Sequence, residues 1–74
     1  MSPYDKLRVK RRDLADTQAR LQQLEAEIEA LPGGPGYADA KTRLMEQANN
    51  HHRVANRLNG EIQFLTSELQ PRLL

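Results

Sequence analysis

Asn49-Asn50-His51-His52 is the only run in this sequence whose side chains could be imagined in metal binding or acid–base chemistry. Adjacent residues of a helix point about 100° apart, so these two histidines cannot chelate one ion together. Zinc-binding histidines on a helix need a spacing of three or four residues, which this run lacks. The run therefore predicts no metal site.

His51 also occupies a position in an apolar repeat, where a polar residue typically specifies register or oligomer state. A sharper hypothesis is that His51 side chains of different subunits meet across a dimer axis. Protonation near the ordinary histidine pKa of ~6.5 would then loosen the assembly.

Other catalytic chemistries find few suitable residues. The chain has no cysteine, which excludes a disulfide and a thiolate metal site. The carboxylates of Glu25, Glu27 and Glu29 alternate around a helix and form no facing pair. The stretch 33–36 is rich in glycine, but a proline interrupts it and a helical pattern precedes it, whereas phosphate-binding loops follow a strand. We expect a protein that is not an enzyme and uses no cofactor and no metal.

The strongest structural signal is the helix-breaking stretch from Leu31 to Gly36, which lies between two helical patterns. Before it, leucine or isoleucine recurs every seven residues at Leu7, Leu14, Leu21 and Ile28. Ser2-Pro3-Tyr4-Asp5 has the residues of a helix start, with Ser2 as the N-cap and Asp5 placed for a capping box. These features predict a first helix over residues 3–31 and a loop over 32–36.

The second helix is predicted over residues 37–70, where seam positions alternate steps of four and three. Gly60 lies off this seam and the repeat continues through it, so we expect no break there. Pro71 is expected to end the helix. The seam positions are Tyr37, Lys41, Leu44, Ala48, His51, Ala55, Leu58, Ile62, Leu65 and Leu69.

Together these patterns predict an all-α fold, an antiparallel two-helix coiled-coil hairpin that forms a single domain over residues 1–74. The short loop favours a register in which facing residue numbers sum to 72. Leu24 is then level with Ala48, and Lys10 with Ile62. This register also brings the two free ends of the hairpin to the same level.

Self-association is expected because two helices leave half of each apolar seam uncovered. A chain of 74 residues without disulfides rarely buries enough apolar area alone. Met45 flanks the seam on one side, and Val54 and Phe64 flank it on the other. We interpret these residues, with His51, as an oligomer or partner interface in a four-helix bundle or higher homo-oligomer. The alternative is that they are isolated apolar residues of an ordinary surface.

Charge is distributed unevenly along the first helix. Residues 1–20 carry six basic and three acidic residues, whereas residues 21–31 carry three glutamates and no basic residue. Both ends oppose the helix dipole, so local helix stability does not explain the arrangement. Three interpretations stay open: a solvated face, antiparallel assembly of two first helices, and phosphate binding at the open end of the hairpin. The basic residues concerned in phosphate binding are Arg8, Arg11, Arg12, Arg53 and Arg57.

The functional prediction is a non-enzymatic homo-oligomeric hairpin that binds another protein as an adaptor, inhibitor or assembly factor. The alternative is a nucleic-acid or anionic-nucleotide binder that uses the five arginines. The near absence of aromatic residues that could stack on bases argues against the alternative. No run is long and apolar enough to suggest a membrane span, and the start of the chain is polar, so we expect a cytoplasmic protein.

Overall fold

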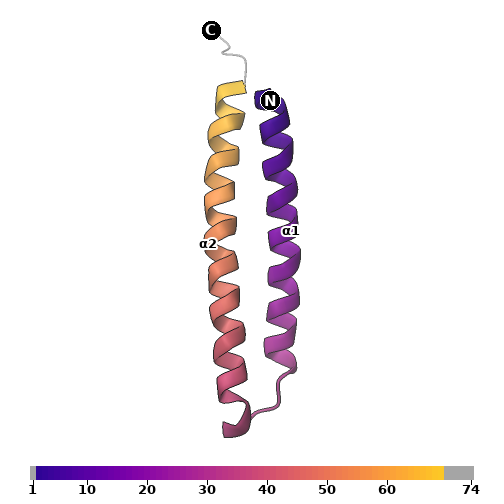
Figure 1. Ribbon diagram of the computed structural model, residues 1–74, viewed down its shortest axis with the longest axis vertical. Helices are drawn as coiled ribbons and strands as arrows, with labels where there is room; N and C mark the ends of the chain where they lie inside the picture. The colour runs from indigo at the N-terminus through magenta and orange to yellow at the C-terminus, as the bar shows by residue number, and fades with distance from the viewer. Residues whose placement is uncertain (1, 70–74) are drawn as a thin grey trace.

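Two long helices lie side by side and antiparallel in the computed structural model, which describes residues 2–69 (Figure 1). Helix α1 spans Pro3–Ala30, a short 3-10 helix η1 spans Pro35–Tyr37, and α2 spans Ala38–Leu69. No strand occurs between residues 2 and 69. The predicted all-α fold of two packed helices is confirmed. Position 70 and Pro71, where we expected the second helix to end, lie outside the described residues.

The start of α1 lies beside the end of α2, and the connection between the helices lies at the opposite end (Figure 1). We call these the open end and the loop end of the hairpin. The molecule measures 60 × 22 × 15 Å, so it is a narrow rod with two broad sides.

Helix α1 ends one residue earlier than predicted, because Leu31 is its C-cap and not its last helical residue. Leu31 has φ −66° and ψ 133°, an extended conformation, and its N–H donates to the carbonyl of Ile28 at 3.3 Å. The ring of Pro32 disfavours helical geometry at the residue before it, which accounts for this conformation. Ser2 is the N-cap, as predicted, and its Oγ accepts from the Asp5 N–H at 3.1 Å.

The second helix begins with a turn of different geometry. Tyr37, the predicted first residue of the helix, belongs to η1, where its N–H donates to the Gly34 carbonyl at 3.3 Å. Gly34 has φ 133°, a backbone conformation that residues with a Cβ rarely adopt. Helix α2 then continues through Gly60 without interruption, as the unbroken repeat predicted.

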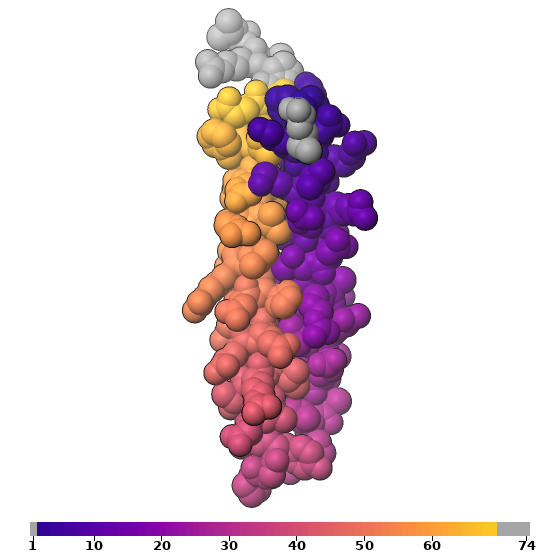
Figure 2. Space-filling model, viewed as in Figure 1, coloured from indigo at the N-terminus to yellow at the C-terminus, as the bar shows by residue number. Residues whose placement is uncertain are grey.

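The core is thin and lies between the two helices, whose side chains meet along the hairpin (Figure 2). Leu24 is the only side chain between residues 2 and 69 that is completely enclosed. Around it, α2 contributes the small buried residues Ala48 and Ala55. The partly buried residues Leu14, Ile28 and Leu44 pack against this cluster. The buried apolar residues are Leu7, Leu21, Leu24, Ala48, Ala55 and Leu58.

Neither α1 nor α2 contains a segment apolar enough to span a lipid bilayer.

Candidate functional site

A groove of about 580 Å³ lies at the open end, between the first turns of α1 and the last turns of α2. We call it the open-end groove. Gly60 lines it, and a Cβ built on this residue would meet no atom within 4 Å. The residues of the groove that matter below are Lys6, Lys10, Arg57, Glu61, Phe64 and Leu65.

The charged residues of the groove are partly paired with one another. The ammonium group of Lys10 in α1 donates to Glu61 in α2, and the Arg57 Nε lies 3.6 Å from the other carboxylate oxygen of Glu61. The hydrogen bond from Lys10 lowers the pKa of Glu61, and desolvation opposes this effect in part. Lys6 also lines the groove, so basic side chains outnumber carboxylates in the groove.

The apolar lining of the groove includes Leu65 and Phe64, whose side chain is 66% exposed. A second depression of about 360 Å³ adjoins it along α1 and shares Lys6 and Lys10. Val9, which is 44% exposed, lines this depression with Asp13. Apolar surface rimmed by basic side chains is suited to non-covalent binding.

The predicted interface residues are spread along α2. Phe64 lies in the open-end groove, Val54 is half-buried, and Met45 is 48% exposed nearer the loop end. Met45 and Phe64 are about 28 Å apart along the helix axis at ~1.5 Å per residue. The structure therefore does not bring the predicted interface residues into one compact patch.

The two histidines lie in different environments. His51 is half-buried, and its Nδ1 lies 2.8 Å from the carbonyl oxygen of Gln47, one turn earlier. His52 is exposed and contacts the other helix, where its Nε2 lies 3.5 Å from Oε1 of Glu25. Sequence reasoning missed the second contact, because it depends on the register between the helices. Residues 2–69 contain no cluster of three or more metal-binding side chains.

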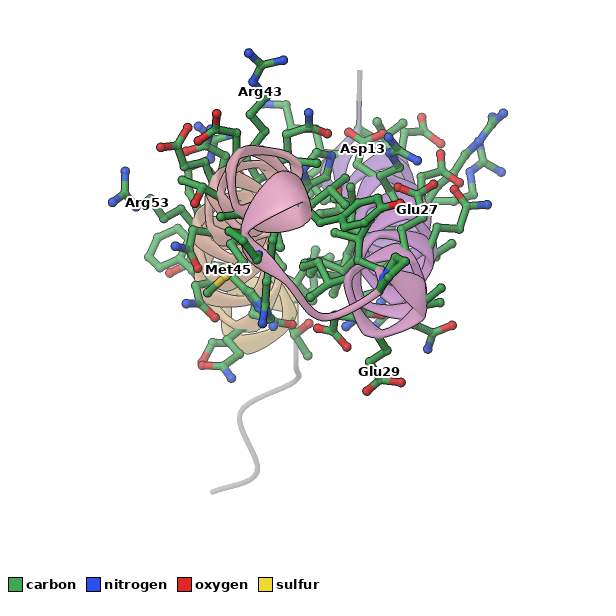
Figure 3. All side chains as sticks on the ribbon, turned by 90° about the horizontal axis from the view of Figure 1, so that it is seen from below. Asp13, Glu27, Glu29, Arg43, Met45 and Arg53 are labelled. Carbon is green, nitrogen blue, oxygen red and sulfur yellow. The ribbon has the colours of Figure 1, made fainter. Side chains whose placement is uncertain are left out.

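The five predicted phosphate-binding arginines do not converge. Viewed along the hairpin from the loop end, Arg53 points away from α1, which carries three of the others (Figure 3). Arg57 contacts Glu61, which lies four residues later in the same helix. Arg11 and Arg12 are exposed and form no ion pair within residues 2–69.

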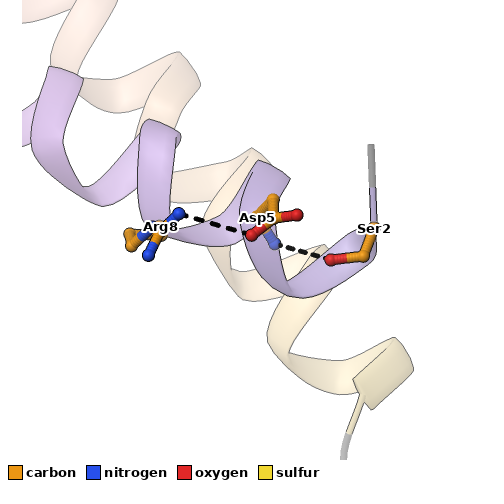
Figure 4. Close-up of polar contacts among 3 residues, drawn as sticks. All are labelled: Ser2, Asp5 and Arg8. Atoms are coloured by element: carbon orange, nitrogen blue, oxygen red, sulfur yellow. Dashed lines mark hydrogen bonds and ion pairs between the residues drawn. The ribbon is translucent and has the colours of Figure 1, made fainter.

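Arg8 is engaged near the helix start, where its Nη2 lies 3.4 Å from Asp5 Oδ1 (Figure 4). The expected capping box is therefore incomplete: Ser2 accepts from the Asp5 N–H, but the Asp5 carboxylate turns to Arg8. The Arg8 and Asp5 side chains are 81% and 50% exposed, so this pair adds little to stability.

Comparison with known proteins gives no relative for this chain: no family model matches it, and neither a curated protein nor a solved structure does.

Proposed function

We propose that this protein is a non-enzymatic helical hairpin of the cytoplasm that associates with itself and acts by binding another protein, as an adaptor, inhibitor or assembly factor. The observation that carries the proposal is the imbalance between its core and its surface. Six apolar side chains are buried, while Val9, Met45 and Phe64 remain between 44% and 66% exposed. Phe64 lies in the open-end groove and Val9 in the depression beside it, and neighbouring exposed apolar side chains of this kind are typical of an interaction surface.

The size of the molecule supports self-association. A two-helix hairpin without a disulfide buries little apolar area, and small domains of this kind are commonly stabilised by oligomerisation. Two hairpins packed side on side form a four-helix bundle, in which the uncovered halves of both seams become core. The same surfaces could bind a helix of a different protein by the same packing.

Phosphate binding is a second candidate function. Arg11 and Arg12 favour it, because both are exposed without a carboxylate partner among residues 2–69. The five arginines point in different directions, and this arrangement is less favourable for phosphate binding than a single patch of arginines. The candidates differ in their response to salt, since neutralising several phosphates makes affinity fall steeply with ionic strength and an apolar interface responds little.

The test is sedimentation equilibrium of the purified chain at micromolar concentrations. We expect a dimer or larger species that persists in high salt, and no retardation of DNA or RNA at low salt. A monomer at every concentration would contradict the self-association, and salt-sensitive retardation of nucleic acid would favour phosphate binding.

A matched pair of variants tests the role of apolar surface. Phe64 and Tyr4 are equally exposed, at 66% and 67%, and both lie at the open end. We expect Phe64→Ala to weaken self-association by about 10-fold, a typical effect of removing a buried aromatic anchor from an interface. Tyr4 lies outside the groove, so Tyr4→Ala should leave self-association unchanged.

A further inference from the structure

Four charged residues of α1 follow one another at intervals of seven, and their signs alternate: Lys6, Asp13, Arg20 and Glu27. We call them the charge row. All four side chains are exposed, and none forms an ion pair within residues 2–69. Seven residues make nearly two complete turns, so the four side chains follow one side of the helix.

The charge row lies on the same side of the hairpin as the open-end groove. Lys6 lines the groove, and Lys6 with Asp13 lines the adjoining depression. In the view along the hairpin, Asp13 and Glu27 lie on the same side as Arg43 of α2, and Glu29 lies on the opposite side (Figure 3).

Contacts within the chain do not account for the alternation. Successive members of the row are about 10 Å apart at ~1.5 Å per residue, which is close to the screening length in physiological salt. Arg20, which has Asp16 four residues before it, instead donates to Gln23 Oε1 at 3.2 Å. The row therefore has charges available for a partner outside the chain.

A second copy of α1, antiparallel to the first, matches the row at every position. When facing residue numbers sum to 33, Lys6 lies opposite the partner's Glu27, and Asp13 lies opposite the partner's Arg20. The two-fold symmetry repeats both pairs, so a dimer contains four. A parallel copy in register would place like charges opposite one another.

We propose that this side of the hairpin is a homodimer interface in which α1 packs antiparallel to α1 of the partner, with facing residue numbers summing to 33. The proposal rests on the self-association proposed above and adds its face, orientation and register. Phe64 and Val9 supply apolar contact beside the charge row, and the pairs of opposite charge fix the orientation.

The second helix fits the same arrangement. The contact between Lys10 and Glu61 places residues 16 and 17 of α1 level with about residue 55 of α2. A two-fold axis at this level brings Arg43 opposite the partner's Glu68, a further pair of opposite charge. A side of 60 × 22 Å offers roughly 1,300 Å² per copy, more than the roughly 800 Å² per partner of a standard interface.

Charge reversal in single and double variants tests the proposal by sedimentation equilibrium at low ionic strength. Lys6→Glu and Glu27→Lys each place two like-charged pairs in the dimer, and each should weaken dimerisation on the order of 10-fold. The double variant K6E/E27K restores opposite charges and should recover the wild-type affinity. Because residues 6 and 27 lie about 32 Å apart along one helix, recovery cannot arise within a single chain.

Glu29→Lys is the matched control, because it makes the same charge change two residues away on the opposite side of the hairpin. It should leave dimerisation unchanged. Equal effects of Glu27→Lys and Glu29→Lys, or a double variant no better than either single one, would overturn the proposed face and register. A wild-type chain that stays monomeric would overturn the self-association itself, so the two failures are distinguishable. Circular dichroism of each variant confirms that the helices are intact.

Introduced cysteines give a second measurement, since the natural chain has none. Asp16 lies three residues after Asp13 and near the proposed two-fold axis, where the dimer brings two Asp16 carboxylates together. Asp16→Cys removes this local repulsion, so it should form a disulfide-linked dimer under mild oxidation. Gln18 lies within two residues of the axis level, but it lines a depression with His52 on the other side. Efficient dimer formation by Gln18→Cys and none by Asp16→Cys would place the interface on the side of Gln18 and His52, and it would overturn the proposal.

Discussion

Lys10 of α1 donates a hydrogen bond to Glu61 of α2, joining residues 51 positions apart in the sequence. Lys10 occupies a seam position at which an apolar residue is usual, and it extends to a carboxylate beside the seam. Their side chains are 32% and 37% exposed, so both keep contact with water. The pair links the two helices at the open end and forms part of the groove.

Glu61 should make the stability of the hairpin depend on acid pH. Its pKa is lowered in the folded chain, chiefly by the hydrogen bond from Lys10, so the unfolded chain binds its proton more readily. The stabilising contribution is present above the pKa of the unfolded chain and is lost as pH falls through the lower pKa of the folded chain. Glu61→Gln should therefore lose less stability than the wild type on acidification.

Thermal unfolding followed by circular dichroism at neutral pH and near pH 3 measures this difference. We expect it to be small, because the pair is partly solvated. Glu46→Gln is the control: this residue forms no ion pair within residues 2–69, and the variant should follow the wild-type profile. Identical profiles for Glu61→Gln and the wild type would show that the Lys10 contact does not persist in solution.

Leu24 should be the residue most sensitive to truncation, because its side chain is completely enclosed. Leu24→Ala removes three carbon atoms from a core that has few others, and cavities of this kind typically cost about 2–5 kcal/mol. Since a small domain has little stability in reserve, urea denaturation should show a hairpin that is largely unfolded or strongly destabilised. Gln22→Ala, at an exposed position of the same helix, should change stability by no more than about 0.5 kcal/mol.

The sequence predicts the helices and their connection well, because local chemistry decides both. Pro32 and Gly34 exclude a continuous helix, and the seven-residue repeats give each helix its buried side. The observed end of the first helix and start of the second each differ from the prediction by one residue, because the backbone is restricted at both places. Leu31 precedes a proline, and Tyr37 lies in a 3-10 turn.

The groove could not be predicted in the same way, because it depends on relations between the helices. Arg57 and Phe64 were recognised as candidates, but their association with Lys6 and Lys10 follows from the register at the open end. For Gly60 the repeat predicted only an unbroken helix, whereas the structure places this residue in the lining of the groove. Spacing along one helix shows which residues share a side, and the facing helix decides what they contact.

Gly60 also provides a test of helix stability that separates two kinds of glycine. Gly60→Ala should stabilise α2 by about 0.5–1 kcal/mol, because alanine restricts the unfolded chain more than glycine does. An added Cβ meets no atom within 4 Å at this position. Gly34→Ala should have the opposite effect, since φ 133° is strained for a residue with a Cβ although space is equally open there. Urea denaturation of both variants measures the contrast; a gain in stability for Gly34→Ala would contradict the loop conformation.

Ser2 should stabilise the first turn of α1 through its cap. Its Oγ satisfies the N–H of Asp5 at 3.1 Å, one of the helix-start donors that lack a partner in the helix (Figure 4). Ser2→Ala should cost about 0.5–2 kcal/mol, and Ser2→Asp should retain most of the stability, because a carboxylate accepts the same hydrogen bond and suits the positive end of the helix dipole.

Ser67→Ala is the matched control: Ser67 lies exposed inside α2, where alanine is the better helix former, so this variant should be neutral or slightly stabilising. Amide hydrogen exchange at Asp5 locates the effect, and unchanged protection there in Ser2→Ala would show that the cap does not form in solution.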